Sequence, residues 1–200
     1  MADLFEEKAK DWDANDMIKA LSQAVGGAIL AKVALKPGME VMDFGAGTGL
    51  ITAQVAQRVG RVTAVDVSQA MLDKLTAKAE LQGKVETVCQ DIVAQPIGRE
   101  FDLIVSAMAM HHVQDTRAMV RRFAEHLKPG AQVALADLDA EDGTFHPEGT
   151  QGVFHDGFAR DAFQKVLEEN GFSGVQFVTA HTVQKETGAY PVFLATATRA

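Results

Sequence analysis

Cysteine and the largest aromatic residues are scarce in this sequence, whose 200 residues include one Cys, one Trp and one Tyr. The single Cys89 excludes an internal disulfide and is typical of a protein from the reducing cytoplasm, where we expect this chain to act. No early segment joins a charged start to an apolar run and a cleavage site, so we expect no secretory signal. No apolar run is long enough to cross a bilayer, so we expect no membrane span.

Basic residues are outnumbered, with 19 Lys and Arg against 27 Asp and Glu and a formal net charge of −8. This charge argues against a general affinity for nucleic acid or for anionic membrane surfaces, and Arg121-Arg122 is the one basic pair. A hydrophobic content of 47% and a charged content of 23% are ordinary for a globular chain. The length suits a single domain over residues 1–200, as a monomer or a homodimer.

Apolar and glycine patterning instead dominate residues 41–50, which read VMDFGAGTGL. The apolar start predicts a strand buried on both faces. Gly45, Gly47 and Gly49 then allow a sharp turn and a close approach of the backbone to a ligand. A helix follows over 50–56, with Thr48 as its expected cap. The start of such a helix presents free N–H groups and favours an anionic or strongly polar ligand group.

The spacing of this loop argues against a dinucleotide site. A dinucleotide fingerprint requires a glycine where Leu50 stands. Asp43 lies two residues before the first glycine, and a carboxylate there suits a cationic ligand better than a pyrophosphate. The alternative is a glycine-rich turn that binds no ligand. Three alternating glycines are a costly choice for a merely structural turn, because glycine loses the most conformational freedom on folding.

Strands and helices alternate along the rest of the chain and then end in a strand pair, which predicts a three-layer α/β sandwich. The expected helices cover 16–34, 50–56, a segment capped by Ser68, 116–127 and 158–169. The expected strands cover 41–44, 61–66, 84–89, 101–105, 132–137, 174–179 and 192–198.

Two of these stretches resemble a known family. The loop resembles the acid-x-Gly-x-Gly-x-Gly motif of class I S-adenosylmethionine-dependent methyltransferases, and LKPGAQVALADLD at 127–139 resembles their helix-turn-strand unit. The chain is similar to the small-molecule, type 11 branch, specifically over residues 38–138 and loosely elsewhere. The resemblance implies a Rossmann-like, seven-stranded, mostly parallel sheet of order 3-2-1-4-5-7-6 with an antiparallel last strand.

The family also implies a cofactor site for S-adenosyl-L-methionine, with S-adenosyl-L-homocysteine as product. Asp66 ends a strand about 20 residues after the loop, where an acid accepts hydrogen bonds from ribose hydroxyls. By resemblance, Asp91 binds the adenine amino group and Ile92 lies against its ring. We expect residues 1–35 to form a helical cap over the cofactor, although residues 1–15 are equally consistent with a flexible arm docked by Trp12. The cofactor-binding candidates are Trp12, Asp43, Gly45, Ala46, Gly47, Asp66, Val67, Met71, Asp91, Ile92 and Ser106.

Histidines follow the fourth expected strand, in the sequence SAMAMHHV at 106–113, which resembles the segment after that strand in the same family. Ligands bind at such carboxyl ends, and histidine can act as a general base near neutral pH. His111, His112 and Asp137 are therefore the catalytic candidates. A packing or hydrogen-bonding role for the two histidines is the alternative.

Residues 138–157 are long for a connection and show no periodicity, which predicts an insert on the acceptor side. The substrate-binding candidates are His112, His146 and His155, while a surface loop anchored by its aromatics is the alternative. These histidines, with His111 and Asp137 or Asp139, could also converge on a metal. Their spacing matches no tight ligand motif, so we expect no metal.

The predicted function is methyl transfer to an O, N or other nucleophile of a small molecule. Nucleic acid is not the expected partner, because the fourth strand lacks the Asn/Asp-Pro-Pro-aromatic motif used for exocyclic amines. Two alternatives stay open, a nicotinamide-dependent oxidoreductase and a non-catalytic S-adenosylmethionine-binding module.

Overall fold

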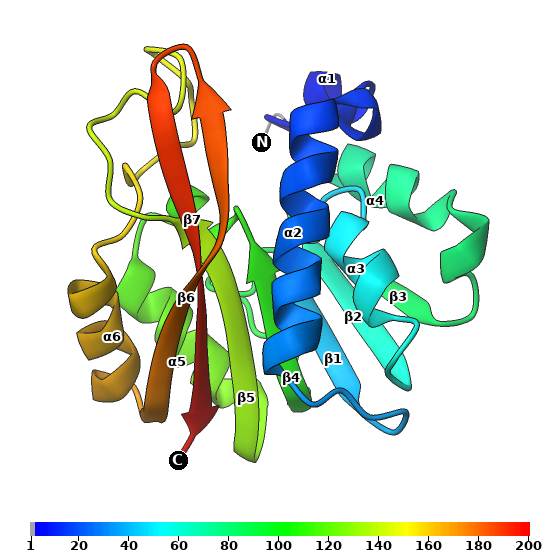
Figure 1. Ribbon diagram of the computed structural model, residues 1–200. Coiled ribbons are helices and arrows are strands. Elements are labelled where there is room, and N and C mark those ends of the chain that lie inside the picture. Colours follow the sequence, from blue (N-terminus) through cyan, green and yellow to red (C-terminus); the bar gives the residue numbers. More distant parts are fainter. Residues whose placement is uncertain (1–2) are drawn as a thin grey trace.

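A seven-stranded sheet forms the middle layer of the computed structural model, which describes residues 3–200 (Figure 1). Its order is β3-β2-β1-β4-β5-β7-β6, with β7 antiparallel to both of its neighbours, so the predicted topology is confirmed. The strands are β1 (Glu40–Phe44), β2 (Arg61–Asp66), β3 (Val85–Cys89), β4 (Phe101–Ala107), β5 (Leu127–Leu138), β6 (Phe172–Lys185) and β7 (Gly188–Arg199).

Helices cover both faces of the sheet. The helices are α1 (Glu6–Ala9), α2 (Asp16–Lys32), α3 (Leu50–Val55), α4 (Gln69–Thr76), α5 (Thr116–Glu125) and α6 (Arg160–Glu169), with short 3-10 turns η1 (Trp12–Ala14), η2 (Ala79–Leu81) and η3 (Met110–His112). Among the described residues, no helix is both long and apolar enough to pass through a membrane.

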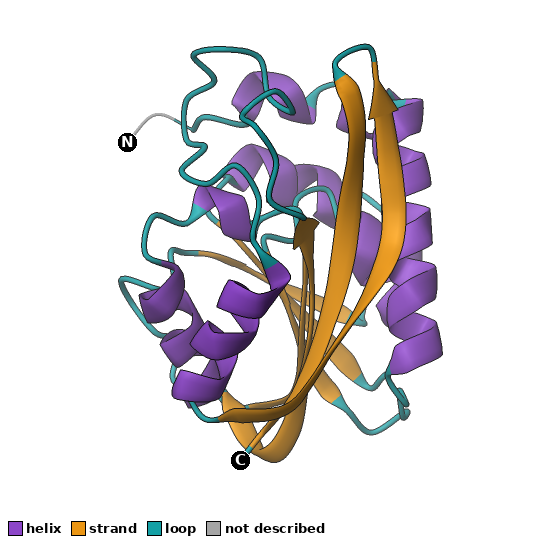
Figure 2. Cartoon of the chain, turned by 60° about the vertical axis from the view of Figure 1, so that its left-hand side comes forward, coloured by secondary structure: helices purple, strands orange, loops and turns teal. Residues whose placement is uncertain are grey.

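Alternation along the strands divides the apolar side chains into two clusters. In β1, Val41 joins the cluster under α2, α3 and α4, while Met42 and Phe44 join the cluster under α5 and α6. All three side chains are buried, as the apolar start of the 41–50 segment predicts. The two clusters fix which helices lie on which face (Figures 1 and 2).

The longest helix, α2, packs on the sheet through Val25 and Ile29, and Asn15 caps its start by accepting two backbone N–H bonds with its side chain. Glycine has a low helix propensity, but packing explains why Gly26 lies inside this helix. A Cβ on Gly26 would lie 2.1 Å from the side chain of Gln54, which donates to the carbonyl of Ser22. The glycine therefore lets α2 and α3 approach closely.

The structure departs from the predicted elements in three places. Strand β5 begins at Leu127, five residues before the predicted 132–137, where the sequence predicts the end of a helix. Thr48 does not cap α3, because Gly49 is the capping residue and the Thr48 hydroxyl donates to Asp13 instead. The last two strands, β6 and β7, are also much longer than the predicted 174–179 and 192–198, and they form a hairpin around Glu186-Thr187 (Figure 2). Much of β6 is only partly buried, so its sequence shows little apolar alternation.

Phe123 lies fully buried in the cluster under α5 and α6, with its ring centroid 5.0 Å from that of Phe44. We expect Phe123→Ala to lower the free energy of unfolding by about 3–5 kcal/mol, because it removes a large core side chain and leaves a cavity. Phe154, 52% exposed, is the matched control, and Phe154→Ala should change stability by less than about 0.5 kcal/mol. Urea denaturation measures both, and equal effects would contradict this assignment of the core.

Candidate functional site

The polar candidates gather at the carboxyl ends of the parallel strands. The glycine loop follows β1, Asp66 ends β2, the histidine turn η3 follows β4, and Asp137 lies near the end of β5. The chain leaves β1 for β2 on one side and returns to β4 on the other, so β1 and β4 form a topological switch point. Open α/β sheets bind their ligands at this position.

The three loop glycines have positive φ, at 68° for Gly45, 54° for Gly47 and 85° for Gly49, in the region that favours glycine. A Cβ on Gly45 would lie 2.2 Å from the Cβ of Ala109, so the loop packs directly against the segment after β4. A Cβ on Gly47 would meet no protein atom within 4 Å. Gly47 thus borders open space, where a ligand can approach the backbone.

Most amides of the loop that precedes α3 are occupied by protein acceptors. The N–H groups of Gly45 and Ala46 both donate to the carbonyl of Val65, and that of Gly49 donates to Ala46. Gly47 donates to the Asp66 carboxylate at 2.8 Å. A loop bonded in this way is poorly suited to a pyrophosphate, whose oxygens need free N–H donors.

Asp66, at the end of β2, lies beside the glycine loop. Its two oxygens accept from the backbone N–H groups of Gly47, at 2.8 Å, and Ser68, at 2.9 Å. Burial raises the pKa of this carboxyl. An ionised carboxylate has about four acceptor sites, so Asp66 keeps capacity for hydroxyl donors.

Asp43 lies beneath the loop and is 1% exposed. Its carboxylate accepts from the hydroxyl of Thr52 at 2.5 Å. Burial raises the pKa of Asp43 to about 7, and the nearby charge of Asp66 adds to this effect. A positive ligand group over the loop would favour the ionised form.

The other cofactor candidates divide into exposed and buried ones. Val67 is 62% exposed, and Asp91 is exposed with one oxygen accepting from the N–H groups of its own turn. The side chains of Met71 and Ile92 are buried, and the buried hydroxyl of Ser106 donates to the carbonyl of Phe44. The structure therefore leaves Val67 and Asp91 open to a ligand, whereas the side chains of Met71, Ile92 and Ser106 are buried in the protein.

The expected cap of residues 1–35 consists of two parts, and residues 1–2 lie outside the described chain. Residues 3–15 lie across the strand ends, because Asp3 accepts from the Ser68 hydroxyl at 2.8 Å and Asp13 accepts from the Thr48 hydroxyl at 2.5 Å. Trp12 is half-buried in η1 of this part. The second part, α2, is a layer helix on the sheet.

Asp137 holds the histidine turn. Its side chain is completely buried and accepts the N–H groups of Met110, His111 and Leu138 at 2.9, 3.2 and 2.8 Å. It also accepts from Nδ1 of His111 at 2.7 Å. With four partners, this carboxylate has no access to a substrate, so it orients His111. Met108, just before the turn, has a φ of 57°, an unfavourable value for a residue with a side chain.

Three imidazoles, those of His111, His112 and His146, meet beside Asp137, and we call them the imidazole trio. The ring of His111 lies 4.2 Å from that of His112 and 5.1 Å from that of His146 between centroids. Nδ1 of His112 donates to the carbonyl of Gly152 at 2.6 Å. Burial, and then the neighbouring His111, lower the pKa of His112 and of His146 to about 4, so both are neutral at pH 7.

His155 lies apart from the trio, although the sequence groups it with His112 and His146. Its Nε2 contacts the carbonyl of Val113 at 2.9 Å and the hydroxyl of Thr116 at 3.2 Å. It therefore attaches the insert to the segment before α5. Asp139, weighed above as a metal ligand, forms a bidentate pair with Arg160. Within residues 3–200, no group of three or more His, Cys, Asp or Glu is arranged to hold a metal ion.

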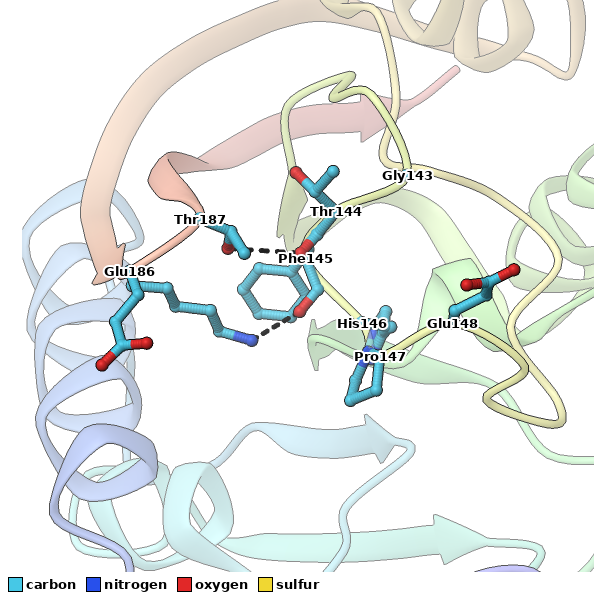
Figure 3. A pocket seen from close by; sticks show the side chains of 9 residues that line it. Gly143, Thr144, Phe145, His146, Pro147, Glu148, Glu186 and Thr187 are labelled. Carbon is cyan, nitrogen blue, oxygen red and sulfur yellow. Dashed lines mark hydrogen bonds between the residues drawn. The ribbon is translucent and has the colours of Figure 1, made fainter.

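A cavity of about 600 Å³ opens between the insert and the turn of the β6–β7 hairpin (Figure 3). Its lining residues are Gly143, Thr144, Phe145, His146, Pro147, Glu148, Lys185, Glu186 and Thr187. Lys185 donates to the carbonyl of Phe145 at 2.5 Å and lies 3.8 Å from its ring centroid. Sequence reasoning missed the hairpin side of this cavity, because the predicted strands stop before Lys185.

Comparisons with known proteins identify the family of this chain. Residues 41–130 match a family described as methyltransferase domain. An uncharacterized methyltransferase of Schizosaccharomyces pombe is 31% identical over 160 residues, which are 72% of this chain and 56% of that protein. The chain thus spans little more than half the length of this relative.

Two solved structures share the fold. A methyltransferase of Haloferax volcanii, solved with the Trm112 methyltransferase activator, has a TM-score of 0.81 at 16% identity and covers 100% of this chain and 99% of its own. The N-methyltransferase NodS of Bradyrhizobium japonicum, solved with S-adenosyl-L-homocysteine, has a TM-score of 0.71 at 19% identity, over 94% and 89%. The family match and the relative show that this chain belongs to the class I S-adenosylmethionine-dependent methyltransferases, and the two structures share its fold.

The raised pKa of Asp43 predicts a pH dependence of stability. An unfolded aspartate has a pKa of about 4, whereas that of Asp43 in the native state is about 7. Between pH 4 and 7 the native state therefore holds the proton that the unfolded state releases, so the contribution of Asp43 to stability falls as pH rises. We expect Asp43→Asn to remove this loss, by up to about 1.4 kcal/mol per pH unit within that window. Urea denaturation of both proteins from pH 4 to 8 measures the difference, and a difference independent of pH would contradict the raised pKa.

Proposed function

We propose that this chain transfers the methyl group of S-adenosylmethionine to a nucleophile of a small molecule. One observation carries the proposal, namely the close packing of the glycine loop against the segment that leads into the imidazole trio. Gly45 has no room for a Cβ beside Ala109, two residues before His111. A cofactor over Gly47 therefore lies next to side chains that can bind an acceptor.

The cofactor fits the residues present at this edge. Bound S-adenosylmethionine supplies an electrophilic methyl group on a positively charged sulfur. Asp66 would accept from the ribose hydroxyls, exposed Val67 would contact the adenine ring, and Asp91 would bind its amino group. Residues 3–15 would cover the site and exclude water, which strengthens polar interactions inside it. The ribose and adenine roles rest on the family resemblance.

The acceptor side is formed by His112, His146 and the insert 138–157. Phe5 from the N-terminal segment packs its ring edge-on to His112, at 5.3 Å between centroids. Neutral imidazoles among aromatic rings suit a mostly apolar ligand with a few polar groups. The net charge of −8 argues against nucleic acid as acceptor. Asp137 and the trio favour a catalytic protein over a cofactor-binding module, because a module needs no oriented imidazoles.

The cofactor site can be tested with Asp66→Ala. We expect the affinity for S-adenosyl-L-homocysteine to fall about 10- to 150-fold, the range for a lost hydrogen bond to a charged group. Asp73→Ala is the control, because Asp73 is an exposed carboxylate on α4 whose one side-chain hydrogen bond among the described residues is with Gln69. Isothermal titration calorimetry measures both. Tight binding of NADH together with no binding of S-adenosyl-L-homocysteine would refute the proposed cofactor.

The acceptor side can be tested with His112→Ala and His155→Ala. Once a screen of hydroxyl and amine compounds has identified an acceptor, both variants should reduce its turnover while leaving the affinity for S-adenosyl-L-homocysteine within about twofold. His112→Ala removes the hydrogen bond from the His112 ring to the carbonyl of Gly152 in the insert. His155→Ala removes the contact with Val113 that attaches the insert. His181→Ala, on β6, is the control. Loss of cofactor affinity in both variants, or unchanged turnover in both, would show that this wall is misassigned.

A further inference from the structure

The imidazole trio contains an ordered chain of hydrogen bonds that runs from the cavity wall into the sheet. His146 lines the cavity between the insert and the hairpin (Figure 3). Its Nε2 lies 3.3 Å from Nε2 of the buried His111, which is 1% exposed. Nδ1 of His111 then lies 2.7 Å from the Asp137 carboxylate. The chain therefore connects a ligand-accessible ring to a buried negative charge.

The hydrogen-bond partners fix the resting positions of the protons. Asp137 accepts at every contact, so Nδ1 of His111 carries the hydrogen. In the neutral ring, Nε2 of His111 is then an acceptor, and Nε2 of His146 must donate to it. The lone pair of His146 therefore resides on Nδ1. Within residues 3–200 this nitrogen has no hydrogen-bond partner, so it is free to accept one from a ligand.

We propose that His146, His111 and Asp137 form a proton relay, in which Nδ1 of His146 takes the proton of an acceptor hydroxyl or ammonium group. This inference rests on the proposed methyl transfer and names the class of its acceptor, a nucleophile that carries a proton. His146 is the catalytic base of the relay. His111 stores the proton, and Asp137 is a positioning residue.

The proton and electron balance of the relay is complete. As the acceptor oxygen or nitrogen forms its bond to the methyl carbon, the methyl–sulfur bond breaks and its electron pair stays on sulfur. The acceptor proton moves to Nδ1 of His146. The proton on Nε2 of His146 moves to Nε2 of His111, which becomes an imidazolium next to Asp137. His146 ends neutral, with its hydrogen on Nδ1, and the stored proton later returns to solvent by the same path.

The charges around the two rings favour storage on His111. His146 faces cationic Lys8 and Lys185 and the rings of His111 and His112, all of which oppose a positive charge on it. His111 is in direct contact with the Asp137 carboxylate, which favours such a charge. His112 stays outside the relay, because its Nδ1 is bound to the carbonyl of Gly152.

Nitrogen chemical shifts of the histidine rings test the relay without any acceptor. We would record them on 15N-labelled protein bound to S-adenosyl-L-homocysteine, from pH 4 to 9. When His111 gains its proton, His146 should change from the Nε2–H to the Nδ1–H tautomer at the same midpoint. Asp137→Asn should move the tautomer change of His146 to lower pH, because a protonated His111 loses its opposite charge.

A second variant keeps the test decisive if Asp137→Asn does not fold. His146→Gln should change the titration of the His111 ring, whereas the control His181→Gln, on β6, should leave both rings unchanged. An Nδ1–H tautomer of His146 in the neutral state, or a tautomer that does not respond to His111, would overturn the relay. Calorimetry with S-adenosyl-L-homocysteine on the same samples tests the proposed function separately.

The acceptor class has its own test. Purified protein with S-adenosylmethionine would be offered 4-methoxyphenol, ethanolamine and dimethyl sulfide, and release of S-adenosyl-L-homocysteine would be measured. Turnover of the hydroxyl or the amine supports the class. Turnover of the sulfide alone, which has no proton to lose, would overturn it while leaving methyl transfer intact.

Discussion

The buried carboxylate of Asp137 joins the parts of the site that come from different strands. It sits near the end of β5, yet two of its four partners are the backbone N–H groups of Met110 and His111, in the turn after β4. A buried carboxylate must be fully bonded, because each missing partner costs about 1–3 kcal/mol or more for a charged group. The turn can therefore adopt few other conformations, and His111 is held in one tautomer. The position of the imidazole trio follows from this constraint.

The position of the turn after β4 also connects the glycine loop to the insert 138–157. The turn after β4 lies so close to the glycine loop that Gly45 has no room for a side chain beside Ala109. On its other side, the carbonyl of His111 accepts from the N–H of Phe154 in the insert. The glycine loop, the histidine turn and the insert 138–157 thus form one continuous contact surface. A shift in any of these elements would be transmitted to the others, because packed interiors deform little.

Sequence reasoning predicted the elements whose signals are local. The apolar run of β1, the alternating glycines and the acid Asp66 lie close together in the chain, and each has a direct physical meaning. The role of Thr48 was mispredicted, because its partner Asp13 is 35 positions away in the sequence. The contact of His111 with His146 and the separation of His155 depend in the same way on how the insert folds back. No local pattern encodes such distances. The predicted strands 174–179 and 192–198 are shorter than β6 and β7, because much of β6 lacks apolar alternation.

Buried titratable groups at this edge act on stability in opposite directions. The folded-state pKa of Asp43 is raised to about 7, so its contribution is present in acid and is lost as pH rises from about 4 to 7. The pKa values of His112 and His146 are lowered to about 4 in the folded state. As pH falls below about 6.5, the unfolded state therefore takes up protons that the folded state does not, and the fold loses stability. The windows overlap between about pH 4 and 6.5, and the contributions partly cancel there. Because two histidines oppose one aspartate, these groups together make the fold more stable as pH rises from about 4 to 6.5, and Asp43 offsets the effect of only one histidine.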